Sequence, residues 1–539
     1  MKKLLQYLGN YKKESILGPL FKLLEASFEL IVPLVMAAII DTGVANADRP
    51  YIMKMSLVLF LLALIGLTCA ITAQYFAAKA AVGCATGLRH ALFEHIETLS
   101  FTEMDTVGTS TLITRMTSDV NQVQNGVNLV LRLFLRSPFI VFGAMVMAFT
   151  IDVKAALVFV VTIPLLSVVV FGIMLVSIPL YKKVQAALDK VLGITRENLT
   201  GSRVIRAFNK EQDEIAQFHE DNEALTKIQL YVGKISALMN PLTYIIINGA
   251  IVVLVWVGAI RVDNGNITQG QVVALVSYMS QILVELIKLA NLIININKSI
   301  ACMNRIETVL DMESSITEHP AAETGSLTSD GAGREGKETI PAENAVVFSK
   351  VGLTYAGASE EALSDIDFTV RRGETIGIIG GTGSGKSSVV NLIPRFYDAT
   401  RGEVLVDGKN VRDYTLEELR AKVGVVLQKA VLFKGTIREN LSWGNSHATD
   451  EEMYEALETA QAREFVDAKE GGLSYEIEQG GRNLSGGQRQ RLTIARALVK
   501  KPQILIMDDS ASALDFATDA ALRKAIAHMD GQMTVFLSL

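Results

Sequence analysis

Charge-free apolar stretches long enough to cross a lipid bilayer constrain this chain more than any other feature. They run over Met55–Ala78, Ala155–Leu180 and Ile235–Ile260, and each exceeds the about 20 residues that a helix needs to cross the hydrocarbon core. Three weaker apolar stretches carry charges: about 15–40, with Lys22, Glu25 and Glu29; about 128–151, with Arg132 and Arg136; and about 267–293, with Glu285 and Lys288. Half of the 539 residues are hydrophobic. The sequence therefore predicts an all-α membrane domain over residues 1–311, with six helices at about 15–40, 53–80, 128–151, 154–181, 235–261 and 267–293.

The segments between these helices alternate in length. Short segments follow the first, third and fifth helices, whereas Lys79 to about Gly126 and Tyr181 to about Lys234 are long, polar and patterned as helices. The second long loop is rich in Lys and Arg, and such loops stay on the cytosolic side of a membrane. We therefore expect a multi-pass protein of the cell membrane whose long helical loops and two termini are cytoplasmic.

The acidic residues of the first helix have two interpretations. Glu25 and Glu29 are four residues apart and share one helix face. Either they face a wet cavity and attract cationic substrates, since a charge near the bilayer centre costs about 3 kcal/mol, or they lie near the cytosolic end and pair with Lys22. We favour the pairing with Lys22, and we expect Glu285 to pair in the same way with Lys288.

A change of composition separates this domain from a second one. Residues 312–342 are rich in Gly, Ser, Thr and Glu, which is typical of a flexible linker. From 343 to 539 short β-type runs such as "TIGIIG" and "QILIMDD" alternate with helical stretches, the pattern of an α/β domain with a largely parallel sheet.

Charge and cysteine content exclude several classes of function. The formal net charge of -6 gives no basic footprint for nucleic acid. The three cysteines, Cys69, Cys84 and Cys302, are odd in number and far apart, which supports neither a disulfide framework nor a zinc site. We expect three free thiols in apolar helices.

A phosphate-binding loop marks the second domain. "TIGIIGGTGSGKSSVVNLI" contains a strand, a glycine-rich turn and a helix, the context that a P-loop requires. Backbone N–H groups of such a loop cradle phosphates, the lysine reaches the terminal phosphates and the following hydroxyl binds Mg²⁺. The residues assigned to ATP are Gly380, Gly381, Thr382, Gly383, Ser384, Gly385, Lys386, Ser387 and Ser388, with Ser387 as a metal ligand.

Two acidic residues follow the apolar run "QILIM". Asp508 closes this strand and is suited to hold Mg²⁺ directly or through water. Asp509 comes next, at the position where a second acidic residue positions the attacking water. The sequence therefore predicts a site for ATP and Mg²⁺.

A third motif makes the resemblance specific. "LSGGQ" at 484–488 continues as "RQRLTIARAL" and is followed by "ILIMDD" and "SALD", and this series resembles the nucleotide-binding domain of ABC transporters. Together with the six helices and two long loops, the whole chain is similar to one half of an ABC exporter of the multidrug type. Segments 109–120 and 197–214 also resemble the intracellular loops of that family, and we expect 109–112 and 208–213 to be the tips that dock onto the ATPase domains.

The resemblance assigns further roles by position. Tyr355 is similar to the aromatic residue that stacks on adenine, although a strand tyrosine that packs a core remains an alternative. Gln428 is similar to the Q-loop glutamine that touches Mg²⁺, and Ser512 and Asp515 match the D-loop. In the family each ATP lies between one subunit's P-loop and the other subunit's signature. The signature residues Leu484, Ser485, Gly486, Gly487 and Gln488 are thus expected to act on the ATP of a partner half-transporter.

Asp509 departs from the family pattern, which has Glu at this position. The shorter side chain withdraws the carboxylate by about 1.5 Å, and a misplacement of about 1 Å costs on the order of 100-fold in rate. This departure predicts that the site binds Mg-ATP and hydrolyses it slowly, as in the degenerate half of a heterodimeric exporter. A backbone adjustment that lets Asp replace Glu, in a homodimer, remains the alternative.

The end of the sequence falls near another family residue. The resemblance places a switch histidine soon after "MTVFLSL", so that Leu539 either occupies that position or precedes it, and the α/β domain is expected to be C-terminally short.

Three classes of function remain open. An ATP-driven exporter of hydrophobic or amphipathic drugs or lipids fits all of these features and is preferred. An importer of the same architecture, such as one for metal chelates, shares every motif and would cause accumulation instead of efflux. A non-transporting ATP-dependent regulator would lack transport even with its partner present.

Overall fold

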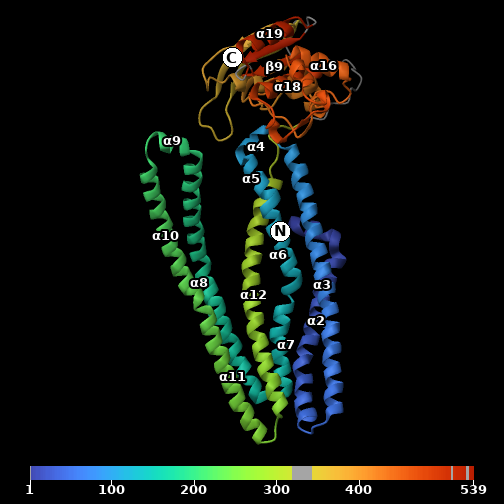
Figure 1. Cartoon of the computed structure of the whole chain (residues 1–539), viewed down its shortest axis with the longest axis vertical. Helices are drawn as coiled ribbons and strands as arrows, with labels where there is room; N and C mark the ends of the chain where they lie inside the picture. Colours follow the sequence, from blue (N-terminus) through green and yellow to red (C-terminus); the bar gives the residue numbers. More distant parts are fainter. Residues whose placement is uncertain (1, 318–342, 511–513, 530–532, 539) are drawn as a thin grey trace, which may run out of the picture. The chain divides into compact units, whose positions relative to one another are not determined.

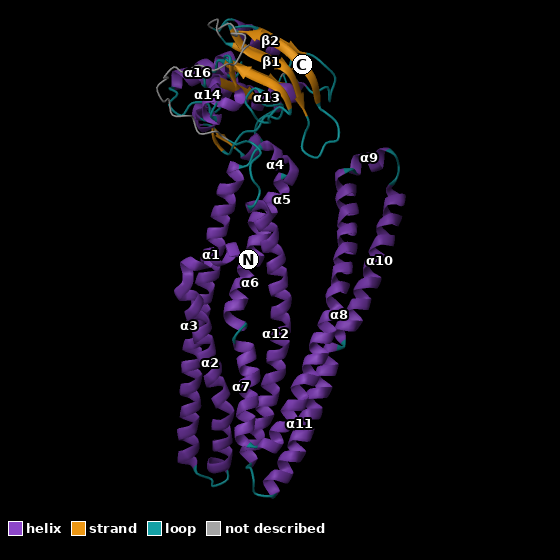
Figure 2. Ribbon diagram, turned by 180° about the vertical axis from the view of Figure 1, so that it is seen from behind, coloured by secondary structure: helices purple, strands orange, loops and turns teal. Residues whose placement is uncertain are grey.

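The computed structural model describes residues 2–317, 343–510, 514–529 and 533–538. The chain divides into two compact units, Met1–Glu97 with Ser110–Asp311 and Thr98–Thr109 with Met312–Leu539. All described strands belong to the second unit (Figure 2). The predicted fold class, a helical membrane domain followed by an α/β domain, is confirmed.

The described part of the first unit is helical, with short helices between long ones. They are α1 (Lys2–Leu8), α2 (Lys12–Ala38), α3 (Arg49–Thr98), α5 (Thr109–Thr114), α6 (Val120–Leu133), α7 (Arg136–Ile151), α8 (Val153–Thr200), α9 (Ser202–Ala207), α10 (Glu211–Ala237), α11 (Met239–Asp263) and α12 (Gln269–Leu310). A short helix of the second unit, α4 (Phe101–Val107), joins α3 to α5.

Six stretches of the described chain are long and apolar enough to cross a membrane, which confirms the predicted number. They are Gln6–Val44, Arg49–Thr98, Thr109–Ile151, Val153–Thr200, Glu211–Asp263 and Gln269–Leu310. Most extend well past the predicted bounds: the 50 residues of α3 correspond to about 75 Å, against a hydrocarbon core of about 30 Å. The predicted long loops are thus continuations of the spanning helices.

The sixth span, α12, forms the centre of this unit. It packs against α2, α6, α7, α8 and α11, and its fully buried Tyr278 donates a hydrogen bond to the Leu30 carbonyl oxygen of α2 at 2.6 Å. The helices α8 and α10 run side by side, with α9 at the end of their hairpin (Figure 1). By contrast only 6% of the most apolar window of α3 is buried within the chain, so its apolar surface suits contact with lipid.

The charged residues of the spans are paired, partly as expected. Lys22 Nζ lies 2.6 Å from Glu25 Oε2, and Lys288 Nζ lies 2.8 Å from Glu285 Oε1, which confirms both local pairs. The prediction for Glu29 is wrong, because its Oε2 accepts a hydrogen bond from Arg136 Nη2 of α7 at 2.7 Å. Packing of α2 against α7 brings these residues together, which no local pattern indicates. The three cysteines are free and buried, as predicted.

The described residues of the second unit form three small sheets. Its strands are β1 (Asn344–Leu353), β2 (Leu363–Arg371), β3 (Thr375–Ile378), β4 (Arg401–Val406), β5 (Lys409–Asn410), β6 (Val423–Val426), β7 (Gly435–Thr436), β8 (Glu476–Ile477), β9 (Ile504–Asp508) and β10 (Thr534–Ser538). The sheet orders are β2-β1-β4-β5, antiparallel; β3-β10-β9-β6, parallel; and β7-β8.

The remaining helices of this unit are α13 (Lys386–Leu392), α14 (Leu416–Lys422), α15 (Ile437–Ser442), α16 (Asp450–Thr459), α17 (Arg463–Asp467), α18 (Gly486–Val499) and α19 (Phe516–Ala527). Strand β9, which is apolar up to its last residue Asp508, serves two hydrophobic cores. Its Ile504 and Ile506 pack with α13 and the antiparallel sheet, whereas Leu505 and Met507 pack with α16 and α18. Successive side chains of a strand point to opposite faces, which explains why a strand buried on both faces reads as a continuous apolar run.

Candidate functional site

The parallel sheet gathers the site residues at one edge. Ser538 of β10 is paired with Ile378 of β3 on one side and with Asp508 of β9 on the other. Val426 of β6 is paired with Met507. Because the carboxyl ends of parallel strands meet at one edge, the loops after β3, β6 and β9 converge there, and ligands of open α/β sheets bind at such an edge.

The phosphate loop after β3 needs its glycines. Gly383 and Gly385 have φ of +83° and +90°, a backbone conformation that side chains disfavour. A Cβ on Gly385 would lie 2.7 Å from Leu363 Cδ2, and one on Gly380 would lie 2.5 Å from Ser384 Oγ. The loop thus has the close turn that lets backbone N–H groups approach phosphates.

The lysine of this loop is partly exposed and is bound to the loop itself. Lys386 Nζ donates to the carbonyl oxygens of Gly380 and Gly381 at 2.7 and 3.1 Å. These are neutral acceptors on the surface, and the ammonium is free to exchange them for an anion, with which it makes a stronger charge-assisted bond.

A hydroxyl and a carboxylate meet beside the loop. Ser387 Oγ donates to Asp508 Oδ1 at 2.9 Å, and Asp508 is 5% exposed. Hard oxygen ligands of this kind are those that Mg²⁺ takes in phosphate sites. The residues present therefore fit Mg-ATP: Ser387 and Asp508 would hold the ion, and Lys386 with the loop amides would hold the phosphates.

The second aspartate has an unusual backbone. Asp509 has φ of +44°, and its Oδ2 accepts a hydrogen bond from Gln428 Nε2 at 3.0 Å. Gln428 follows β6, the neighbour of β9, so that the sheet order explains why the two side chains meet. The structure thus brings Gln428 to Asp509, the residue next to Asp508.

Tyr355 lies in the loop after β1 and is partly buried against the core of the antiparallel sheet. Its hydroxyl donates to Ser388 Oγ at 2.8 Å, which ties it to the first turn of α13. Its ring meets the Tyr397 ring edge-on, with centroids 5.2 Å apart. Tyr355 therefore lies beside the phosphate loop and also packs a core.

The signature segment forms the start of α18. Leu484 is buried, whereas Ser485 and Gly486 are exposed. Ser485 Oγ accepts the Gln488 N–H at 3.2 Å, and Gln488 Oε1 accepts the Ser485 N–H at 3.0 Å. This reciprocal capping box was missed at the sequence level, although its pattern, Ser followed three residues later by Gln, is a known signal of a helix start.

The D-loop is described only in part, because Ser512 lies outside the described residues. Leu539, named above for the switch position, also lies outside them. Asp515 caps α19, because Oδ1 accepts the Thr518 N–H at 2.9 Å. This backbone bond, with the bond from the Thr518 hydroxyl, lowers the pKa of Asp515.

The docking segment of the first long loop begins earlier than predicted. Thr98–Thr109 packs with the ATPase part; it contains α4 and reaches the first residue of the predicted tip 109–112, and docking by the rest of that tip stays a prediction. Ser100 and Glu103 form a capping box at the start of α4, and Gly108, with φ of +78°, ends it. These short-range signals fix a separate helix one turn before the predicted tip. The second predicted tip, 208–213, follows α9 and stays a prediction.

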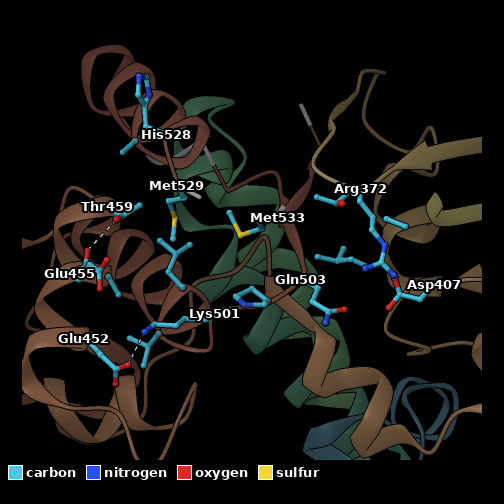
Figure 3. A pocket seen from close by; sticks show the side chains of 18 residues that line it. Arg372, Asp407, Glu452, Glu455, Thr459, Lys501, Gln503, His528, Met529 and Met533 are labelled. Atoms are coloured by element: carbon cyan, nitrogen blue, oxygen red, sulfur yellow. Dashed lines mark hydrogen bonds and ion pairs between the residues drawn. The ribbon is translucent and has the colours of Figure 1, made fainter. Parts of the chain in front are cut away.

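A large cavity of the second unit lies away from the phosphate loop. Its volume is about 700 Å³, and its lining includes Ile504 and Thr534, the first residues of β9 and β10. Figure 3 shows Glu452 paired with Lys501 on one side and Arg372 beside Asp407 on the other. Because Asp508 is at the opposite end of β9, this cavity is not part of the candidate nucleotide site.

Comparisons with known proteins agree with this geometry. Residues 15–286 match the family described as ABC transporter transmembrane region, and residues 363–512 match the family described as ABC transporter. An uncharacterized ABC transporter ATP-binding protein of Mycobacterium tuberculosis is 35% identical over 99% of this chain and 89% of its own length.

Two further relatives have names that state an activity. YgaD of Bacillus subtilis, whose name assigns it to multidrug export, is 32% identical, with 100% of this chain and 91% of YgaD covered. The ATP-dependent lipid A-core flippase of Desulfotalea psychrophila is 32% identical over 83% of this chain and 75% of the flippase.

Proposed function

The chain belongs to the ABC transporter family, with an exporter-type transmembrane region fused to an ATP-binding domain, and on this premise we propose that it is the degenerate half of a heterodimeric exporter. In this proposal its own site holds Mg-ATP and hydrolyses it slowly, while its signature completes the catalytic site of a partner half-transporter. The exported compounds are hydrophobic or amphipathic drugs or lipids.

The observation that carries the proposal is the state of Asp509. The family pattern has a glutamate here, and the shorter aspartate accepts the Gln428 amide at 3.0 Å on a backbone with φ of +44°. A carboxylate that is shorter by about 1.5 Å and turned toward Gln428 is poorly placed to orient water, and such a displacement costs on the order of 100-fold in rate. The neighbouring Asp508, Ser387 and Lys386 keep the residue types that suit Mg²⁺ and phosphate.

The signature supports a partner whose site is competent. Ser485 and Gly486 are exposed at the start of α18, a helix of 14 residues whose N-terminus attracts an anion. Within the described part of the chain, the Ser485 hydroxyl accepts a backbone N–H, and its proton can be donated to a γ-phosphate. An intact signature beside a weakened acidic pair suits a heterodimer in which hydrolysis occurs at the partner's P-loop.

The transport step follows from alternating access. ATP supplies the free energy when it is bound between the two ATP-binding domains. This chain's P-loop residues and the partner's signature then hold the domains closed, the long cytosolic helices transmit the closure, and the spans reopen outward. We propose that both termini and the long loops are cytoplasmic, in line with the Lys and Arg content of the loops. The relatives named for multidrug export and lipid A-core flipping support an apolar or amphipathic substrate.

The test is ATP turnover by the chain, alone and co-expressed with its genomic neighbour. We compare Asp509→Glu in this chain with Glu→Gln at the corresponding position of the partner. The partner's substitution is expected to abolish turnover, whereas Asp509→Glu adds comparatively little to the intact pair. Brisk hydrolysis by this chain alone would instead make Asp509 a working residue and favour a homodimer.

A transport assay separates the remaining classes of function. Inside-out vesicles that contain the pair should concentrate an amphipathic dye in the presence of Mg-ATP if the pair exports. Depletion of the dye from the vesicles would indicate an importer. An active ATPase that moves none of a panel of dyes and labelled lipids would favour a regulator.

A further inference from the structure

The N-terminal segment is seated on two glycines of α3. A short helix, η1 (Gly9–Tyr11), joins α1 to α2. A Cβ on Gly83 would lie 2.1 Å from Tyr11 Cζ, and a Cβ on Gly87 would lie 3.4 Å from Tyr7 Cδ1. The two glycines are four residues apart and share one face of α3. They form a groove that holds both tyrosine rings, and a larger residue at Gly83 would displace the ring above it.

This groove lies where α3 leaves the membrane. The charge-free run Met55–Ala78 corresponds to about 36 Å of helix at about 1.5 Å per residue, which suffices for a hydrocarbon core of about 30 Å. Lys79 follows directly. Tyr75, one turn before Lys79, is 61% exposed, and exposed tyrosines are typical of the membrane interface. Because Gly83 is one turn beyond Lys79, the groove lies at the level of the lipid headgroups.

The first residues of α2 lie at the same level. The helices α2 and α3 run side by side in opposite directions (Figure 1). Gly18 packs on α3, since a Cβ there would lie 3.4 Å from the Ala77 backbone nitrogen. Lys12 and Lys13 precede Gly18 by about 8–9 Å of helix, so they lie just outside the apolar run. Their long side chains can reach back toward the lipid phosphates.

The charges of these two lysines are available to a ligand. Both side chains are exposed. The neighbouring carboxylate, Glu14, is already paired with Lys79 Nζ at 2.9 Å. Within the described part of the chain, neither Lys12 nor Lys13 makes an ion pair. The start of α2 therefore carries two positive charges that no carboxylate of the described residues neutralises.

An apolar stripe continues from Lys12 into the membrane. Ile16, Leu20 and Leu24 follow Lys12 at intervals of four residues, which keeps them along one side of α2. Their exposed fractions are 67%, 56% and 43%. This side of α2 thus presents ammonium groups at the level of the headgroups and aliphatic side chains at the level of the acyl chains. Its polarity and charge are complementary to those of an anionic phospholipid.

We propose that Lys12, Lys13 and this side of α2 form a binding site for an anionic phospholipid of the leaflet in which Lys79 lies. The phosphate binds the ammonium groups through charge-assisted hydrogen bonds, and the acyl chains lie along the apolar stripe. A zwitterionic phospholipid carries a positive group beside its phosphate, which the two lysines repel, so the site selects by headgroup charge. The lipid is a constituent of the surrounding bilayer and not the exported compound, so this inference goes beyond the proposed function.

The experiment compares two photoreactive lipids. The full chain, co-purified with its partner, is placed in phosphatidylcholine nanodiscs that contain a trace of phosphatidylglycerol or of phosphatidylcholine, each with the same diazirine in its acyl chain. After illumination and chymotryptic digestion, mass spectrometry measures the label on residues 12–24. The ratio of the label from phosphatidylglycerol to that from phosphatidylcholine isolates the effect of the headgroup.

The wild-type ratio should be well above one. A lysine near an anionic lipid contributes about fivefold, so the two lysines together should give a ratio of about 25. Lys12→Gln together with Lys13→Gln should lower it to about one, and either substitution alone to about five. Because salt screens exposed charges, about 0.5 M NaCl should lower the wild-type ratio several-fold relative to about 0.05 M, whereas the double variant should show little dependence on salt.

Two further variants separate a local site from a general attraction to the surface. Gly83→Ala displaces the Tyr11 ring and with it the start of α2, and it should lower the ratio although no charge changes. Lys182→Gln together with Lys183→Gln is the matched control. These exposed lysines directly follow the apolar run Ala155–Leu180, so the control removes the same charge at the end of another span. The ratio on residues 12–24 should then remain that of the wild type.

Several results would overturn the proposal. A wild-type ratio near one, or a ratio that the double substitution of Lys12 and Lys13 leaves unchanged, excludes selection by these lysines. An equal decrease in the control means that the charge of the whole surface attracts the lipid, which refutes a local site. A wild-type ratio in Gly83→Ala refutes positioning by the glycine groove. If neither lipid labels residues 12–24, another part of the assembly covers this side of α2 and the site is refuted.

Discussion

Charged residues serve opposite purposes in the two units of this chain. In the membrane unit Arg136 is 7% exposed, and its guanidinium donates to Glu285 Oε1 and Glu29 Oε2, both at 2.7 Å. At the nucleotide site Lys386 is partly exposed, and within the described part of the chain its ammonium bonds to two loop carbonyls. The first charge is committed to its partners by packing, whereas the second is held by contacts that a phosphate replaces at little cost. Burial thus decides whether a charge stabilises the fold or remains available for a ligand.

The buried cluster joins three helices of the membrane unit. Arg136 is the first residue of α7, Glu29 belongs to α2 and Glu285 to α12. Ser137 Oγ adds a bond to Glu285 Oε2 at 2.8 Å, and Lys288 binds Glu285 Oε1. A charge in a spanning segment is costly unless it is paired, and here two cations face two anions. The cluster therefore fixes α2 and α7 against the central helix.

The largest effect on stability is expected from Arg136→Met. The substitution leaves Glu285 with Lys288 alone and leaves Glu29 without its partner across the helix contact. Loss of one member of a buried ion pair lowers the free energy of unfolding by about 3–5 kcal/mol. This loss of stability is measured by unfolding the purified wild-type and variant chains in mixed micelles with sodium dodecyl sulfate.

Two further variants sharpen this result. Lys288→Met removes a side chain that is 42% exposed and leaves the Arg136 contacts intact, so the loss should be much smaller. The pair Arg136→Met with Glu285→Met replaces the buried charges by apolar groups and should recover much of the stability. A double variant as unstable as Arg136→Met would mean that packing volume, and not the unpaired charge, accounts for the loss.

Lys386→Ala is expected to have the opposite effects from Arg136→Met: it should weaken ATP binding and leave stability almost unchanged. It removes a charge-assisted contact to phosphate worth about 1.5–3 kcal/mol, which weakens ATP binding at this chain's site by about 10- to 150-fold. The free energy of unfolding should change little, since the side chain is only partly buried and its ammonium bonds to neutral carbonyl oxygens of its own loop. Parallel measurements of the ATP dissociation constant and of unfolding check both parts.

The control for this variant is Lys227→Ala, which removes an exposed lysine of α10 paired only with Glu223 at 3.5 Å. It should alter neither quantity. A Lys386→Ala chain that unfolds as readily as Arg136→Met would contradict the division between committed and exchangeable charges.

The sequence was informative where function depends on short-range patterns. The six spans and the P-loop, signature and acidic motifs follow from runs of residue types, and the parallel register then brings Ser387, Asp508 and Gln428 to one edge. Glu29 was assigned to Lys22 because helix spacing favours local pairs, and only the packing of α2 against α7 reveals Arg136 as its partner. The hydrogen bond from Tyr397 to Asp105 of α4 is equally long-range, and no local pattern announces it.

The earlier start of the docking segment has a signal in the sequence. The sequence "SFTEMDTVG" contains a Ser and a Glu three residues apart, followed by a glycine, which is a capping box and a helix stop. The segment was instead read as part of one long helical loop. Weighing caps against hydrophobic periodicity would have placed α4 at Phe101–Val107.

Glu103 is intermediate between a buried charge held by its partners and an exchangeable charge at the ligand site. Its substitution should have the smallest effect on stability. Burial alone would raise the pKa of Glu103, but hydrogen bonds from Ser100 and Ser315 outweigh it and lower the pKa below its ordinary value. A carboxylate with a lowered pKa in the fold adds stability that is present in full above its unfolded pKa of about 4.3, and this contribution is lost as the pH falls through the lowered value. Glu103→Gln should therefore lower the free energy of unfolding by about 1 kcal/mol or less, which appears as a small decrease in Tm that is constant between pH 6 and 8. The difference in Tm between the wild type and the variant should shrink below about pH 4.3. A margin that is the same at every pH would show that Glu103 acts through its shape and its neutral hydrogen bonds alone. Glu103 would then belong with neither the committed nor the exchangeable charges.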